Sequence, residues 1–121
     1  MHKYLYIAIG GALGSMLRYF VGQTITERAG ARFPLGTLVV NITACFLIGA
    51  SIEYLHRRAG IDPAWRYLIP IGFIGAYSTF STFEWEIWMN VTGGAFWIAL
   101  SYIVVSLVAG GWSLYRRTRF Y

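Results

Sequence analysis

Two phenylalanines and a run of hydroxyl residues stand together in the middle of a long apolar stretch. Phe80 and Phe83 are three residues apart, so on a helix they share one face, and the hydroxyls of Ser81 and Thr82 lie between them. The edge of an aromatic ring carries partial positive charge, so two rings turned edge-on can face a small anion without trapping it. Hydroxyl donors can replace part of the anion's hydration shell, as in selectivity filters. This pattern predicts recognition of a small anion, although aromatics at this spacing also commonly fill a core.

The stretch around these rings has features that a plain membrane anchor does not need. From Gly72 to Glu86 it contains two glycines, four serines or threonines and two acids. In hydrocarbon, a helix can be interrupted only where its backbone is packed inside protein or lines a wet path. If the segment enters the bilayer near Tyr67, a rise of ~1.5 Å per residue puts Gly75 to Ser78 about 12–17 Å deep, near the middle of a ~30 Å core. We therefore predict a functional break at the midplane.

The composition predicts the element that carries this break. Of 121 residues, 57% are hydrophobic and 12% are charged, too few charges to coat a globular surface, so the chain is expected to be an integral membrane protein. Four apolar segments approach the ~20 residues of a spanning helix. They are Tyr4–Val21, Leu35–Leu55, Tyr67–Asn90 and Ala95–Tyr115. The prediction is an all-α membrane protein in which residues 1–121 form one four-helix channel domain with a broken third helix.

Other protein classes fit the sequence poorly. The histidines, His2 and His56, lie at segment ends and no acid is placed around a nucleophile, so we expect no enzyme. The net charge of +5 comes from basic residues at segment ends, where they meet lipid headgroups, so we expect no nucleic-acid partner.

Polar residues on the remaining helices leave alternatives open. The Asn41 amide must be hydrogen-bonded inside the bilayer, either as a link between helices or along a polar path. Tyr102 and Ser106 are four residues apart, so their hydroxyls can line one face. Arg18 can snorkel to the headgroups or draw anions toward a vestibule, and Glu86 is a second vestibule or gating candidate.

With these residues placed, the chain resembles the Fluc (CrcB-like) fluoride channel family along nearly its whole length. The matching motifs are Gly10–Gly14 with Arg18 and Tyr19, Gly36–Asn41 with Phe46 and Gly49, Gly72–Gly75 with Ser78–Phe83, and Leu100 and Tyr102 with Ser106. The resemblance implies a multi-pass inner-membrane protein, a dimer of antiparallel subunits with two fluoride pathways, and a structural sodium ion at the dimer centre.

The resemblance also implies a role for each matching residue. Phe80 and Phe83 would be the aromatic pair and Asn41 the polar contact to fluoride, with Tyr102 and Ser106 as pathway neighbours. Gly75 and Ser78 would offer backbone carbonyls to the sodium ion, which would be a fixed staple. The function implied is passive leakage of cytoplasmic fluoride, which lowers its toxicity.

The distribution of basic residues bears on the partner. Seven basic residues fall on one side of the predicted membrane against Arg28 and Arg32 on the other, with Arg18 at the border. The seven are Lys3, Arg57, Arg58, Arg66, Arg116, Arg117 and Arg119. A chain that inserts both ways should show little such bias. The partner is therefore either an identical antiparallel subunit or an oppositely oriented homologue.

Two further hypotheses share the size and helix count. A small multidrug-type proton-coupled exporter needs a titratable acid in its first helix, and Tyr4 to Arg18 contains none. A membrane scaffold that transports nothing predicts that Phe80 and Phe83 tolerate replacement by leucine or methionine.

Overall fold

The computed structural model describes residues 2–30, 34–58 and 60–118, with side chains described as far as residue 115. All regular structure within these ranges is helical. The elements are α1 (His2–Ala29), α2 (Leu35–Arg57), α3 (Ala64–Arg66), the π-helical η1 (Tyr67–Ile74), α4 (Gly75–Tyr77), α5 (Ser81–Thr92) and α6 (Phe96–Thr118).

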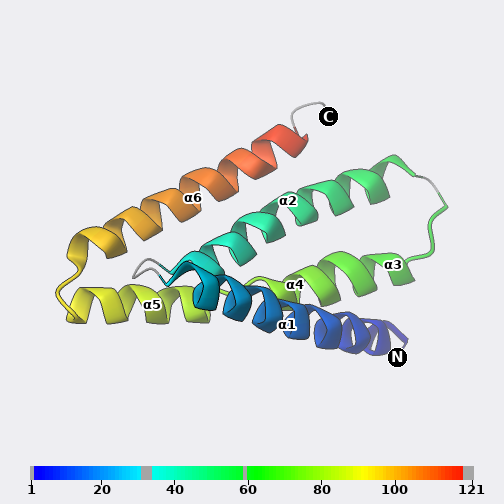
Figure 1. The fold of residues 1–121 in the computed structure, drawn as a ribbon. Helices are drawn as coiled ribbons and strands as arrows, with labels where there is room; N and C mark the ends of the chain where they lie inside the picture. Colours follow the sequence, from blue (N-terminus) through cyan, green and yellow to red (C-terminus); the bar gives the residue numbers. More distant parts are fainter. Residues whose placement is uncertain (1, 31–33, 59, 119–121) are drawn as a thin grey trace.

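The helices pack as neighbours in a small bundle (Figure 1). α2 lies between α6 and the segment formed by α3, η1 and α4, and α1 packs along η1 and α4. Three helices within the described ranges are long and apolar enough to cross a membrane: His2–Ala29, Leu35–Arg57 and Phe96–Tyr115. The expected third segment, Tyr67–Asn90, is divided among η1, α4 and α5, and none of these alone has the length of a span.

Glycines allow α1 and η1 to touch through their backbones. A Cβ atom on Gly10 would lie 2.2 Å from the carbonyl oxygen of Leu68, and one on Gly14 would lie 2.1 Å from that of Phe73. From the opposite side, a Cβ on Gly72 would lie 2.9 Å from the Ile7 carbonyl oxygen. Close backbone approach of this kind gives membrane helices dispersion contacts that longer side chains would prevent. Gly10 and Gly14 of α1 therefore serve helix packing.

This packing gives a matched pair of substitutions. Gly14→Ala is expected to destabilise the protein by about 1–3 kcal/mol, because the new methyl group would overlap backbone that cannot move aside cheaply. In contrast, Gly11→Ala should be tolerated, since its Cβ would meet its nearest neighbour at 3.8 Å. Thermal unfolding of the purified variants in detergent measures the difference. Equal midpoints for the two variants would show that α1 and η1 do not pack this closely.

α1 is longer than the first predicted apolar segment, Tyr4–Val21, because the helix continues through Ala29. Its polar side chains support the extra turns, since Gln23 Nε2 donates to Glu27 Oε1 at 3.1 Å, four residues along. Gly30 then takes φ +58°, a left-handed conformation that ends a helix readily at glycine. The predicted segment therefore ends too early, and residues 31–33 lie outside the described ranges.

A small cluster holds α4 against α2. Val40, Ala44, Ile74 and Tyr77 are buried together, and the Tyr77 ring stacks on Phe73 with centroids 6.3 Å apart. The Tyr77 hydroxyl lies 2.8 Å from Thr43 Oγ1, so its polar end is hydrogen-bonded inside the bundle. This link fixes α4 on α2 directly before the helix is interrupted at Ser78.

Candidate functional site

The backbone leaves the helical conformation at Ser78. α4 ends at Tyr77, Ser78 is extended with φ −77° and ψ 159°, and α5 begins at Ser81. The Ser78 N–H still donates to the Ile74 carbonyl at 3.1 Å, completing the last turn before the interruption.

The side chain of Asn41 supplies the hydrogen bonds that the interruption would otherwise lose. Asn41 Oδ1 accepts the Thr79 N–H at 2.9 Å, and Asn41 Nδ2 donates to the Thr79 carbonyl at 3.0 Å. Both backbone groups of one residue are therefore paired with a single amide on α2. A half-buried backbone group without a partner would be costly in hydrocarbon, so this clamp stabilises the non-helical turn.

The same clamp changes what the Gly75 carbonyl can do. In a continuous helix the Thr79 N–H would donate to the Gly75 carbonyl four residues earlier. Here that N–H donates to Asn41 instead. The Gly75 carbonyl is thereby released from its usual helical donor, and Ser78, with its extended backbone, also lies outside the helical pattern. Backbone carbonyl oxygens outside the helical hydrogen-bond pattern are suitable ligands for a hard cation.

A groove of about 340 Å³ runs past the interruption and collects most of the predicted site residues. Its lining comprises Asn41, Ala44, Cys45, Ile48, Ile74, Gly75, Ser78, Thr79, Phe80, Phe83, Ser106 and Leu107. None of these side chains carries a charge at neutral pH. The groove therefore combines apolar walls with a few amide, hydroxyl and backbone groups, which is the usual composition of a binding site for a small ligand.

The two phenylalanines lie next to one another on the groove wall. Their ring centroids are 6.2 Å apart with the planes tilted by 40°. Phe83 also packs on Tyr102, at 4.9 Å between centroids, and Tyr102 is fully buried. Phe80, in contrast, is 71% exposed, so its outer side is uncovered by the described part of the chain.

Ser106 brings a hydroxyl to the same groove from α6. A serine in a membrane helix often donates to its own helix four residues back, as Ser113 does to the Ala109 carbonyl at 2.9 Å. The Ser106 Oγ atom is buried and has no hydrogen-bond partner in the part of the chain that the structure describes. A buried hydroxyl without a protein partner is available to a bound ligand.

Other predicted residues lie outside the groove lining. Ser81 and Thr82 are exposed at the start of α5, and Arg18 is half-buried on α1. Tyr102 stands behind Phe83, so it does not line the groove beside Ser106 as the four-residue spacing suggested.

Glu86 belongs to a separate polar cluster. Its carboxylate accepts a hydrogen bond from Thr37 Oγ1 on α2, and Tyr102 lies close to both. Sequence reasoning did not single out Thr37 as a site residue. Its position four residues before Asn41 placed it on the same face of α2 and could have indicated it.

Comparison with known proteins decides the family. Residues 5–115 match the family model described as "CrcB-like protein, Camphor Resistance (CrcB)". The chain belongs to the CrcB-like family. Among its relatives, a protein of Acidobacterium capsulatum is 51% identical over 89% of this chain and 86% of its own length. A protein of Solibacter usitatus is 49% identical over 89% of this chain and 88% of its own length.

Both of these CrcB-like relatives are named fluoride-specific ion channel FluC. A third relative with that name, from Rhizobium leguminosarum, is 38% identical and covers 96% of this chain. Together with the long apolar helices, the family places this chain among multi-pass membrane proteins.

Proposed function

We propose that this chain is a fluoride-selective channel that lets cytoplasmic fluoride leave the cell down its gradient and so reduces its toxicity. The observation that carries the proposal is the groove beside Ser78, in which Phe80, Phe83, Asn41 and Ser106 converge. The names of the CrcB-like relatives support it. Channels move ions passively, so the chain is proposed to act without catalysing a reaction.

The groove offers physical reasons for passing a small anion. The Ser106 hydroxyl can donate to fluoride, and the positive edges of the two rings can face it. No cation lines the groove, so the anion would be attracted without being held tightly. An ion must bind well enough to enter and weakly enough to leave.

We propose that η1, α4 and α5 together cross the membrane as a broken third helix, giving four spans. Their chain length from Tyr67 to Thr92 is sufficient, and the interruption at Ser78 falls near its middle. The exposed side of Phe80 leaves the groove open in one subunit. A second, antiparallel subunit would close it, and an antiparallel pair would have two such pathways.

The identity of the second subunit is the remaining choice. Lys3, Arg57, Arg58 and Arg66 lie toward the end of the molecule that holds the start of α1 and the connection after α2 (Figure 1). This arrangement supports a preferred orientation in the membrane. We propose an identical antiparallel partner, which requires that this bias be insufficient to fix one orientation. An oppositely oriented homologue is the alternative.

A structural sodium ion fits the residues at the interruption. Gly75 and Ser78 would hold it through their carbonyl oxygens, because Asn41 takes the N–H that would otherwise donate to Gly75. The two-fold axis of an antiparallel dimer lies in the membrane plane, so two midplane interruptions could meet there and supply four oxygens. The ion would fix the two subunits together and would not itself be transported.

Sodium should therefore raise the stability of the purified dimer. A ligand bound only by the native state stabilises it by about 2.7 kcal/mol at 100 times its dissociation constant. We expect the thermal midpoint to rise when sodium chloride replaces choline chloride at equal ionic strength, and Ser78→Thr to keep this response because only its carbonyl is used. Identical thermal midpoints in the two salts would contradict the proposed sodium site.

The proposed function is tested against proton-coupled export by one efflux experiment. Liposomes loaded with potassium fluoride and treated with valinomycin should release fluoride through the protein without any pH gradient. Leakage of neutral hydrogen fluoride is measured with empty liposomes and subtracted. The corrected rate of fluoride release in the presence of valinomycin should be the same with and without an imposed pH gradient. Release that occurs only with a proton gradient would favour the exporter instead.

A further inference from the structure

A second and larger cavity shares no lining residue with the fluoride groove and lies toward the end of the molecule where α2 is connected to α3. α2 and the segment of α3 and η1 diverge toward this end (Figure 1), and a cavity of about 670 Å³ lies between them. Its walls are Ala50, Ser51, Tyr54 and Leu55 of α2, Arg58, Ile61 and Asp62 of the connection, and Trp65 and Ile69 opposite. We call this space the end groove. Most of its lining is apolar, and its charged residues, Arg58 and Asp62, lie at the outer end.

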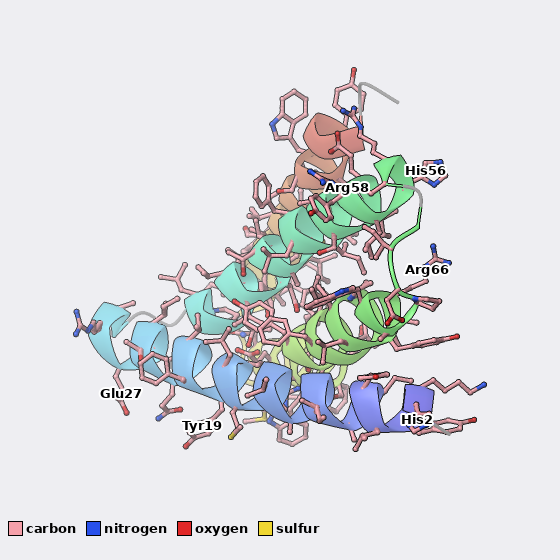
Figure 2. All side chains as sticks on the ribbon, turned by 90° about the vertical axis from the view of Figure 1, so that its right-hand side faces the viewer. His2, Tyr19, Glu27, His56, Arg58 and Arg66 are labelled. Carbon is pink, nitrogen blue, oxygen red and sulfur yellow. The ribbon has the colours of Figure 1, made fainter. Side chains whose placement is uncertain are left out.

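A smaller polar cavity continues the end groove outward. It has a volume of about 230 Å³ and shares Leu55, Arg58, Ile61 and Asp62 with the end groove. Arg66 completes its charged lining. In Figure 2, which views this end of the molecule, the labelled Arg58 and Arg66 come from opposite sides of the connection between α2 and α3. The two cavities therefore adjoin along their shared residues, with both arginines around the smaller cavity and apolar side chains along the larger one.

Among the described residues, neither Arg58 nor Arg66 pairs with an acid, although the Asp62 carboxylate lines the same site. Glu53 pairs with Arg57 at 3.1 Å. Asp62 Oδ1 accepts the Ala64 N–H at 3.0 Å and so caps the short helix α3. The Arg58 guanidinium is positioned by the Tyr54 ring, 4.7 Å from its centroid. A planar guanidinium presents paired donors that match the oxygens of a phosphate.

The depth of the site indicates where its ligand comes from. Tyr54 and Trp65 are about half exposed, at 55% and 50%, and such amphipathic rings settle at the headgroup level of a bilayer. From Arg58 back to Ser51 the apolar wall of α2 extends about 10 Å toward the membrane interior. A free phosphate would leave that wall uncovered. A phospholipid would place its phosphate at the arginines and an acyl chain along the wall.

We propose that the end groove binds an anionic phospholipid from the surrounding bilayer, with its phosphate held by Arg58 and Arg66. An anionic headgroup is favoured over a zwitterionic one because each basic residue near the membrane surface contributes about 1 kcal/mol to binding anionic lipid, roughly a fivefold change in affinity. The site is independent of the proposed fluoride pathway and can be tested without measuring flux.

Native mass spectrometry of the whole chain in detergent tests this site with phosphatidylglycerol and phosphatidylcholine as probes. The wild type should retain phosphatidylglycerol in preference to phosphatidylcholine. Arg58→Gln should lower phosphatidylglycerol retention about fivefold and phosphatidylcholine retention by less, so the preference for the anionic lipid should shrink. The matched control is Arg28→Gln, an exposed arginine at the end of α1 outside the end groove, and it should behave as wild type.

Quenching of tryptophan fluorescence locates the bound lipid. Phosphatidylglycerol with brominated acyl chains should quench more fluorescence than its phosphatidylcholine counterpart, and Trp65→Phe should remove that excess. Equal retention of the two lipids, or an equal loss in Arg28→Gln, would overturn the proposal in favour of general charge attraction. Displacement of the lipid by inorganic phosphate at equal concentration would also overturn it, as would a dimer in which Trp65 cannot be quenched from lipid.

Discussion

Phe80→Ile is expected to reduce fluoride efflux from proteoliposomes at least about a hundredfold, an increase of about 2.7 kcal/mol in the barrier. Isoleucine keeps an apolar side chain in the groove but has no ring edge with partial positive charge to face the anion. Phe80 is 71% exposed within the subunit, so its replacement should leave the fold of the subunit intact. Size-exclusion chromatography checks that the assembly is unchanged, and a fluoride electrode measures the efflux.

The control for this variant is the same change at a phenylalanine outside the groove. Phe20 on α1 is 67% exposed and does not line the groove, so Phe20→Ile should conduct as the wild type does. Phe80→Met tests the scaffold hypothesis, which predicts that any large apolar residue is tolerated at this position. We expect Phe80→Met to lose fluoride efflux, as Phe80→Ile does. Full efflux through both Phe80 variants would mean that the ring is core filling and that the anion takes another path.

Asn41→Asp should abolish efflux through two effects at one position. The carboxylate can still accept the Thr79 N–H, but its second oxygen faces the Thr79 carbonyl, where the amide formerly donated at 3.0 Å. Leaving that carbonyl unsatisfied costs about 1–3 kcal/mol, and the added negative charge repels an approaching anion. Both the efflux rate and the thermal midpoint of the purified variant should fall.

A neutral variant separates these effects. Asn41→Leu removes both hydrogen bonds without adding charge. It should lower the thermal midpoint and the stabilisation by sodium, and it adds no electrostatic repulsion of the anion. Asn90→Asp is the matched control, because Asn90 Nδ2 donates only to the Glu86 carbonyl within its own helix. If Asn41→Asp conducts normally and melts with the wild type, the clamp on Thr79 has no role in the channel.

The sequence predicted the composition of the site better than its geometry. Sequence patterns indicated three of the site residues: Phe80 and Phe83 by their i, i+3 spacing, and Asn41 by its polarity. All three line one groove. The end of α4 at Tyr77 was predictable only to within a few residues, because it depends on a hydrogen bond between positions 38 residues apart. Local propensity does not encode such a contact.

Long-range pairing also explains the residues that sequence reasoning did not place. Tyr77 is buried, and its hydroxyl needs a partner there, which Thr43 supplies from α2. Tyr102 was expected beside Ser106 because of its spacing, but ring packing with Phe83 holds it behind the groove. The extension of α1 to Ala29 is instead a local effect, supported by the pairing of Gln23 with Glu27 across one turn, which a composition-based boundary overlooks.

The most direct test of the central claim is to compare fluoride and chloride efflux from liposomes that contain only this purified chain. We expect rapid passive fluoride efflux, and chloride efflux no faster than from empty liposomes. Fluoride efflux from this single polypeptide would also show that an identical partner is sufficient. Equal rates for fluoride and chloride would contradict the proposed pathway of ring edges and hydroxyls.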